Sequence, residues 1–363
     1  MENTHEKYFL AANSFEGFVS HFADCYSAED GWRCVIIKGG PGTGKSSFMK
    51  YITAAAEDRG YSAVLCPCSS DPDSLDAVII PDLKLALLDG TAPHIVEPRY
   101  PAVCEEILNL GEFWDREKII ENHDEVIAAT ELNRVLHKTA ARYLAACGQL
   151  FYDNLKISRG FTDTARAQSA AIKLADKYIT RKGGKGREQI RFITGITPKG
   201  VVSYTDTVNK FYKNKIIIED KFGGAAGVIT ETIRRCAIAR GYDIITLKSA
   251  FMPTELCDHI LIPQLSLAVV TEHEYISFGG NERRIHARRF CDTAAAHEMR
   301  SRLLFNRRVM RELLLSATAT LERAKRAHDI LEKYYVDAMD FKALAQKAPA
   351  IAEMLLDGTK IDQ

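Results

Sequence analysis

The sequence has no excess of charge of either sign and no long apolar run. Its 363 residues include 48 Lys and Arg against 48 Asp and Glu, which gives a formal net charge of zero. Binding to nucleic acid or to a membrane surface usually relies on a basic excess, so the overall charge favours neither partner. No apolar run approaches the roughly 20 residues of a membrane-spanning helix. Residues 1–7 (MENTHEK) lack the pattern of a signal peptide.

Two further signatures are missing. The nine cysteines contain no C-x-x-C pair, and no nearby Cys/His pair completes a zinc site around Cys66 and Cys68. Reduced thiols are the expectation, which predicts a cytoplasmic protein. The guanine-binding pattern Asn/Thr-Lys-x-Asp is also absent, because Asn209-Lys210 and Asn214-Lys215 lack the aspartate. ATP is therefore expected rather than GTP.

What the sequence does contain is the composition of a globular protein, with 46% hydrophobic and 26% charged residues, and one clear motif. Residues 39–46 (GGPGTGKS) match G-x-x-x-x-G-K-[ST], a loop whose backbone N–H groups surround the phosphates of a nucleoside triphosphate. In this pattern the lysine contacts the β- and γ-phosphates and the serine hydroxyl binds Mg²⁺. The candidate nucleotide-binding residues are Gly39, Gly40, Pro41, Gly42, Thr43, Gly44, Lys45, Ser46 and Ser47.

The flanking residues supply the context that the motif requires. Residues 33–38 form a short apolar run typical of a buried strand. Residues 46–58 place apolar side chains at 3–4-residue spacing, which predicts a helix whose N-terminus favours anions. A glycine-rich turn without a ligand is the alternative.

The sequence is also repeated, with an offset of 181 residues. Residues 35–61 align without a gap to residues 216–242, and eight of these 27 positions are identical, including Gly42 with Gly223. About two identities are expected by chance from composition. The repeat predicts two domains, residues 1–181 and 182–363, joined through the glycine-basic stretch 181–187.

The second copy of the motif is degenerate. Lys45 aligns with Ala226 and Ser46 with Gly227, and Asp220 introduces an anion where a phosphate site disfavours one. Poor triphosphate binding is therefore expected in residues 182–363. A different ligand bound at the Gly223-Gly224 turn is the alternative.

Other candidate residues follow the strands expected at about 62–66 and 84–88. Asp89 follows an apolar strand, as does the acidic Mg²⁺ ligand of phosphate-loop NTPases, and the phosphate loop upstream favours this metal role. A turn formed by the Asp-Gly pair is the alternative. Asp71, Asp73 and Asp76 are candidates to orient a water or an acceptor hydroxyl. The alternative is that Asp73 or Ser74 caps a helix. His94 is a candidate γ-phosphate contact or a loop-stabilising residue.

Long helical segments are expected at 116–153, 163–180 and 294–336, with apolar faces that suit core packing or a lid or partner-binding arm. Nine arginines lie between residues 281 and 311 against three acids. A solvated helix face, an arginine finger that reaches the nucleotide and a nucleic-acid contact are the three interpretations.

Residues 39–46 together with Asp89 resemble the P-loop NTPase superfamily. The duplication, residues 89–94 (DGTAPH) and residues 110–115 (LGEFWD) are similar to a bacterial family of internally duplicated ATPase-like proteins with no assigned reaction. The resemblance implies an α/β fold of two tandem P-loop NTPase-like domains, each a mainly parallel sheet flanked by helices, with long helical extensions. It also implies ATP and Mg²⁺ as cofactors.

The expected function is that of an ATP-binding protein, a Mg²⁺-dependent ATPase or an ATP-driven switch. Lys45 and Asp89 are the expected catalytic residues, and Ser46 and Asp89 the expected metal ligands. A small-molecule or nucleotide kinase and a non-catalytic module stabilised by ATP are the alternatives. Substrate, protein partner and oligomeric state are left open.

Overall fold

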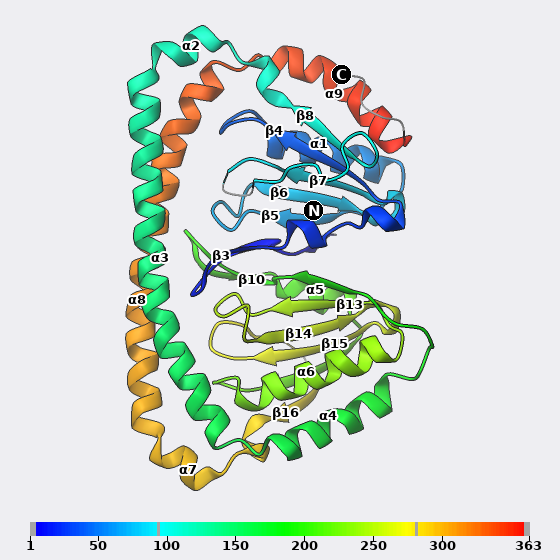
Figure 1. The fold of residues 1–363 in the computed structure, drawn as a ribbon, viewed down its shortest axis with the longest axis vertical. Coiled ribbons are helices and arrows are strands. Elements are labelled where there is room, and N and C mark those ends of the chain that lie inside the picture. The colour runs from blue at the N-terminus through cyan, green and yellow to red at the C-terminus, as the bar shows by residue number, and fades with distance from the viewer. Residues whose placement is uncertain (1–4, 93–94, 280–281, 359–363) are drawn as a thin grey trace. The chain divides into compact units, whose positions relative to one another are not determined.

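The computed structural model describes residues 5–92, 95–279 and 282–358, and it has an α/β fold built around two six-stranded sheets (Figure 1). In each sheet one strand, β6 or β14, runs antiparallel to both of its neighbours, and all the other neighbouring strands are parallel. The first sheet has the order β1 (Glu6–Lys7), β5 (Val64–Pro67), β6 (Leu75–Ile80), β7 (Leu85–Asp89), β4 (Arg33–Lys38) and β8 (Glu105–Asn109). The second has the order β9 (Glu188–Arg191), β13 (Ile244–Lys248), β14 (Cys257–Ile262), β15 (Leu267–Glu272), β12 (Asn214–Glu219) and β16 (Arg283–His286). The repeat in the sequence is thus a repeat of topology.

Strand register fixes which residues of the two copies correspond. Ile37 of β4 lies opposite Asp89 of β7, and its counterpart Ile218 of β12 lies opposite Thr271 of β15. Thr271 therefore holds the place of Asp89. The two remaining pairs of strands, β2 (Ala11–Ser14) with β3 (Gly17–Ser20) and β10 (Thr194–Thr197) with β11 (Gly200–Ser203), form two-stranded sheets.

The helices repeat in the same way. The first copy contains α1 (Lys45–Asp58), α2 (Arg116–Glu121), α3 (His123–Gly160) and α4 (Thr164–Tyr178). The second contains α6 (Gly224–Ala239), α7 (Thr293–Glu298), α8 (Arg300–Asp337) and α9 (Phe341–Leu356), with the short α5 (Thr205–Phe211) before them. Both α3 and α8 are 38 residues long.

Each copy gives its last helix to the other copy's sheet. Helix α9 covers the same face of the first sheet as α1, where Leu344, Ile351 and Leu355 join the buried cluster around Ile52. Helix α4 packs against α6 in the cluster of the second sheet. The apolar faces of α4 and α9 are thus buried against residues distant in the chain, which local periodicity does not reveal.

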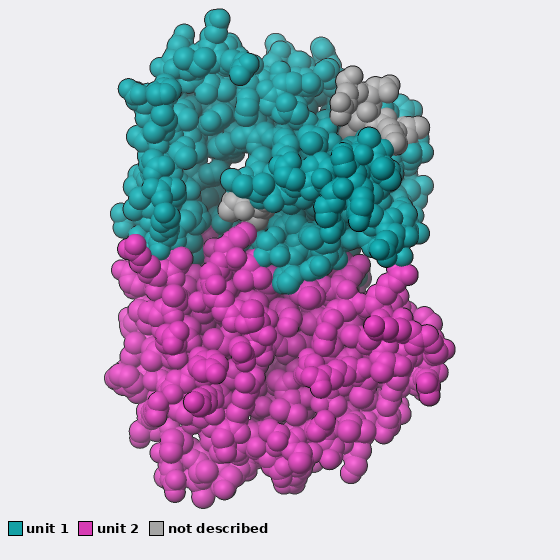
Figure 2. Space-filling model, viewed as in Figure 1, with its two compact units in different colours: residues 1–11, 20–139, 319–363 teal, residues 12–19, 140–318 magenta. Residues whose placement is uncertain are grey.

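The compact units follow this exchange of helices. One unit comprises residues 1–11, 20–139 and 319–363, and the other comprises residues 12–19 and 140–318 (Figure 2). We call them unit 1 and unit 2. The expected boundary at residues 181/182 separates the two copies of the repeat, in an irregular stretch before β9. The compact units divide differently, because α4 packs with the second sheet and α9 with the first.

Most elements expected from the sequence are present. The expected strands correspond to β4, β5 and β7, the expected helix 46–58 to α1, and the long helical segments to α2–α4 and α7–α8. The antiparallel strand β6 was not expected. Within the described ranges, no helix has both the length and the apolar character needed to cross a membrane.

Candidate functional site

The first loop (residues 39–46) connects β4 to α1 at the carboxyl end of the strand. Gly42 and Gly44 have φ angles of 68° and 82°, in the left-handed region that favours glycine, and Gly39 has a φ of 149°. The buried Thr43 hydroxyl donates a hydrogen bond of 3.0 Å to the Gly40 carbonyl. The chain therefore turns tightly into the helix.

Lys45 joins this loop to the neighbouring strand. Its Nζ donates hydrogen bonds to the carbonyl oxygens of Gly39 (3.1 Å) and Gly40 (2.7 Å) and lies 3.6 Å from Asp89 Oδ2. Both side chains are largely buried, with exposed fractions of 10% and 16%. The two residues that were expected to carry the chemistry thus meet at one edge of the sheet.

The backbone N–H groups of the first loop are open. Across the part of the chain that the structure describes, those of Gly42, Gly44, Lys45 and Ser46 donate no hydrogen bond to a protein acceptor, and no side chain caps α1. Unpaired N–H groups at a helix N-terminus carry partial positive charge and bind anions such as phosphate.

Asp89 and Ser46 are held by neighbouring backbone. Asp89 Oδ1 accepts hydrogen bonds from the Thr91 N–H (2.9 Å) and hydroxyl (2.5 Å). Ser46 Oγ accepts one from the Leu75 N–H (3.0 Å). Among the described residues there is no group of three or more His, Cys, Asp or Glu side chains placed to hold a metal. A Mg²⁺ site does not require such a group, because Mg²⁺ in phosphate sites takes one or two protein ligands and otherwise phosphate and water oxygens.

Asp71 and Asp73 lie in the loop between β5 and β6, and Asp76 is the second residue of β6. Asp71 accepts a hydrogen bond from the Ser74 hydroxyl (2.9 Å) and forms an ion pair with Lys325 of α8 at 3.4 Å. No helix follows this loop, because Leu75 begins β6, so the predicted helix cap at Asp73 or Ser74 is wrong. The Lys50 Nζ donates to the Asp73 carbonyl.

Asp76 is buried, with an exposed fraction of 3%. Burial raises the pKa of its carboxyl to about 8, against an opposing contribution from a hydrogen bond with Cys68. Asp258 is its counterpart, the second residue of β14, and burial raises the pKa of that carboxyl to about 7 while Ser249 opposes the shift. Because the degenerate copy retains this arrangement, we interpret the buried acid as a feature of the fold and not of the loop chemistry.

The outer side of the first loop contacts the end of α8. A Cβ atom added to Gly42 would lie 2.8 Å from the Glu332 carbonyl oxygen, and one added to Gly40 would lie 3.1 Å from the Trp114 ring. Trp114 in turn contacts Tyr335 of α8, with ring centroids 5.5 Å apart. These contacts join residues remote in sequence, and no sequence pattern predicts them.

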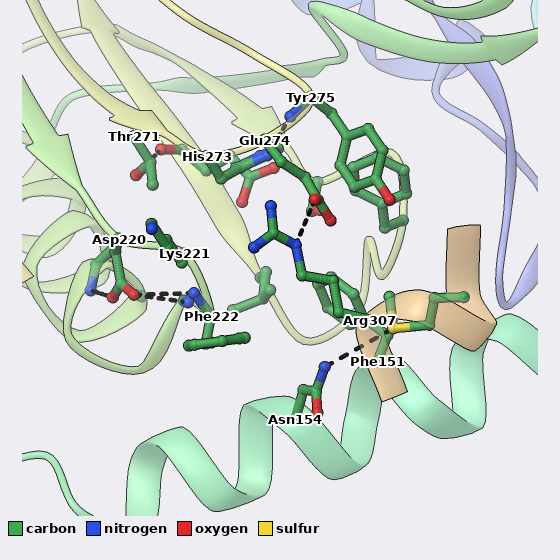
Figure 3. A pocket seen from close by; sticks show the side chains of 18 of the residues that line it. Phe151, Asn154, Asp220, Lys221, Phe222, Thr271, His273, Glu274, Tyr275 and Arg307 are labelled. Carbon is green, nitrogen blue, oxygen red and sulfur yellow. Dashed lines mark hydrogen bonds and ion pairs between the residues drawn. The ribbon is translucent and has the colours of Figure 1, made fainter. Parts of the chain in front are cut away.

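The second loop (residues 220–227) has the opposite electrostatics. Asp220 Oδ1 accepts hydrogen bonds from the N–H groups of Phe222 and Gly223, and Oδ2 from those of Ala225 and Ala226, at 2.9–3.0 Å. Asp220 and Phe222 are labelled in Figure 3. The Asp220 carboxylate was expected to repel a ligand in this loop. Instead the carboxylate lies inside the loop. It accepts the Gly223 N–H, which belongs to the Gly223-Gly224 turn that was the alternative site for a different ligand.

A cavity of about 50 Å³ lies beside Asp220 in unit 2. Its walls include four aromatic side chains and the ion pair between Arg307 and Glu274 at 2.5 Å (Figure 3). Arg302 pairs with Asp153, and Arg284 with Glu219 and Glu272, so several arginines of the basic run are held by acids of unit 2. The aromatic lining consists of Phe151, Phe222, Phe251 and Tyr275.

His94, the candidate γ-phosphate contact, lies outside the described residues. Comparison of the chain with protein-family models, curated proteins and solved structures found no match. The function is therefore argued from the site itself.

Proposed function

We propose that the first loop binds the triphosphate of MgATP and that the protein is a slow ATPase or an ATP-driven switch of the P-loop NTPase type. The observation that carries the proposal is the contrast between the copies. The first loop leaves its N–H groups open beside a lysine, whereas the second supplies its own carboxylate to equivalent N–H groups and has alanine in place of the lysine.

In this proposal each residue of the first loop and its neighbour Asp89 has a separate role. The open N–H groups hold phosphate oxygens, and the Lys45 ammonium exchanges its loop carbonyls for the β- and γ-phosphates. Ser46 and Asp89 are the residues that would hold Mg²⁺, which supplies neutralisation of phosphate charge when bound. Asp89 is followed by Gly90 rather than by a glutamate that would activate water, so turnover is expected to be slow.

The test is calorimetric titration of the purified protein with ATP and Mg²⁺. We expect one binding event per chain, lost in Lys45→Ala and kept in Lys221→Ala, which removes a lysine from the second loop. Ala226→Lys is expected to create no second event, because Asp220 still fills that loop. Binding that survives in Lys45→Ala, or that is lost only in Lys221→Ala, would contradict the proposal.

Turnover assays separate the proposal from its alternatives. Phosphate release without an added acceptor identifies an ATPase or switch. Turnover that appears only with a metabolite or nucleotide identifies a kinase, and tight binding without turnover identifies a module that ATP only stabilises. The Asp71 carboxylate already pairs with Ser74 and Lys325, which favours a role in holding the loop over one in holding an acceptor.

We further propose a cytoplasmic location. All nine cysteines are free thiols, and Cys25, Cys34, Cys66, Cys147 and Cys257 are buried. Unpaired thiols persist where the medium is reducing.

A further inference from the structure

We propose that Asp220 is a built-in ligand: its carboxylate takes the place of a phosphate in the second loop and closes that loop to any external anion. The proposal concerns unit 2 alone and does not depend on nucleotide binding by the first loop.

The geometry is that of a bound anion. Both carboxylate oxygens are used, each accepts two backbone N–H groups at 2.9–3.0 Å, and the residue is 7% exposed. The donors lie on the loop and on the first turn of α6, where the helix dipole favours negative charge. Few side chains reach so many N–H groups, since a helix N-cap usually bonds one or two.

The second loop keeps the backbone conformation of the first at its shared glycine, but its acceptor is a side chain of the protein. By the repeat, Asp220 stands where the first copy has Gly39, and the following glycines, Gly42 and Gly223, share the left-handed conformation with φ angles of 68° and 76°. A glycine at position 39 gives the first loop no carboxylate of its own, whereas an aspartate at position 220 places one inside the second loop. One residue thus decides whether the loop carries its own acceptor.

The consequence concerns which copy responds to a ligand. Ala225 and Ala226 are buried, with exposed fractions of 1% and 2%, so their N–H groups need an acceptor inside the protein. Asp220 provides it permanently, and unit 2 therefore needs no anion for stability. Phosphate-bearing ligands are therefore not expected to stabilise unit 2, which remains in one state whether or not nucleotide is present.

The experiment places Asp220→Gly in a Lys45→Ala background, so that the first loop contributes equally to both proteins. We expect a loss of about 5–10 °C in melting temperature, because four N–H groups lose their acceptor. Inorganic phosphate at tens of millimolar is expected to restore part of this loss, and NaCl of equal ionic strength is not. Asp163→Ala, which removes the side-chain cap of α4, serves as the matched control. It is expected to lower the melting temperature without recovery by phosphate.

An Asp220→Asn variant covers the case in which the glycine variant does not fold. Its amide keeps one acceptor oxygen but turns an NH₂ group toward two N–H donors, so a smaller drop and a smaller phosphate effect are expected. A melting temperature equal to that of the Lys45→Ala parent in either variant would overturn the proposal. So would a drop that phosphate and NaCl alter equally.

Discussion

Lys45 and Asp89 form an ion pair at the carboxyl edge of the first sheet, with Nζ 3.6 Å from Oδ2. Strand register and the repeat place Ala226 and Thr271 at the same two positions of the second sheet. Both members of the pair are thus present in the copy with an open loop and both are absent from the copy whose loop is filled. This joint presence and absence supports a shared role for the two side chains.

Asp89→Asn is expected to lower MgATP turnover by about 10²-fold, because it removes the charge that we propose holds Mg²⁺ and that pairs with Lys45. The amide retains the shape of the side chain and an acceptor for Thr91, so folding is expected to change little. Steady-state phosphate release, with and without EDTA, measures the effect. Thr271→Ala is the matched variant in the second copy and is expected to leave turnover unchanged. Wild-type turnover in Asp89→Asn would assign the metal to other residues.

Gly42→Ala is expected to destabilise the protein by about 2–4 kcal/mol. Left-handed backbone costs a non-glycine residue about 1–2 kcal/mol, and the new Cβ would also lie 2.8 Å from the Glu332 carbonyl oxygen. Gly223→Ala is the matched control. It also places a non-glycine residue in the left-handed region, but its added Cβ would lie at an ordinary 3.5 Å from its nearest neighbour, Leu155. Urea denaturation compares the two. Equal losses of unfolding free energy in the two variants would show that α8 moves away from the new Cβ without destabilising the protein.

The sequence predicted what is local. The first loop is a contiguous motif, and Asp89 ends a recognisable apolar strand. The helices follow from their 3.6-residue period. Sequence patterns therefore predict all three features. Strand β6 was not, because Leu75–Ile80 is buried at every position and shows no alternation. A fully buried run can belong to a strand or to a helix.

What the sequence missed depends on side-chain direction and on long-range packing. The negative charge of Asp220 was visible, but whether it repels a ligand or replaces one depends on a rotamer that turns the carboxylate into its own loop. Likewise, the sequence of α9 shows an apolar face, but it does not show what that face packs against. Its partner α1 lies at the other end of the chain.

The pH dependence of stability offers a separate test of Asp76 and Asp258. Burial raises the pKa of Asp76 from 3.8 to about 8, so its contribution to folding is complete below pH 3.8 and is lost as pH rises towards 8. Asp76→Asn stays neutral and is therefore expected to flatten the decline in the free energy of unfolding across this interval. Asp258→Asn is expected to do so up to about pH 7.

Urea denaturation at several pH values measures these slopes, and Asp58→Asn, at an exposed position, is the control. A decline that is as steep in Asp76→Asn and Asp258→Asn as in the parent protein would mean that these carboxyls titrate at ordinary values.

The exchange of last helices predicts that the two copies of the repeat do not fold separately. A fragment of residues 1–181 lacks α9, and so exposes the sheet face that Leu344, Ile351 and Leu355 cover. Burying each of these side chains contributes about 1.5–3 kcal/mol, and their sum is comparable to the whole stability of an ordinary domain. The fragment of residues 182–363 lacks α4 in the same way.

We therefore expect each fragment to be unfolded or aggregated alone and the two to regain native circular dichroism when refolded together. In the intact chain, Leu355→Ala is expected to cost about 2–5 kcal/mol, and Ile120→Ala, at a 68% exposed position, to cost little. If the fragment of residues 1–181 unfolds cooperatively by itself, α9 is dispensable for the first sheet. The boundary at residues 181/182 would then separate two independent domains, and the helix exchange would add only to their association.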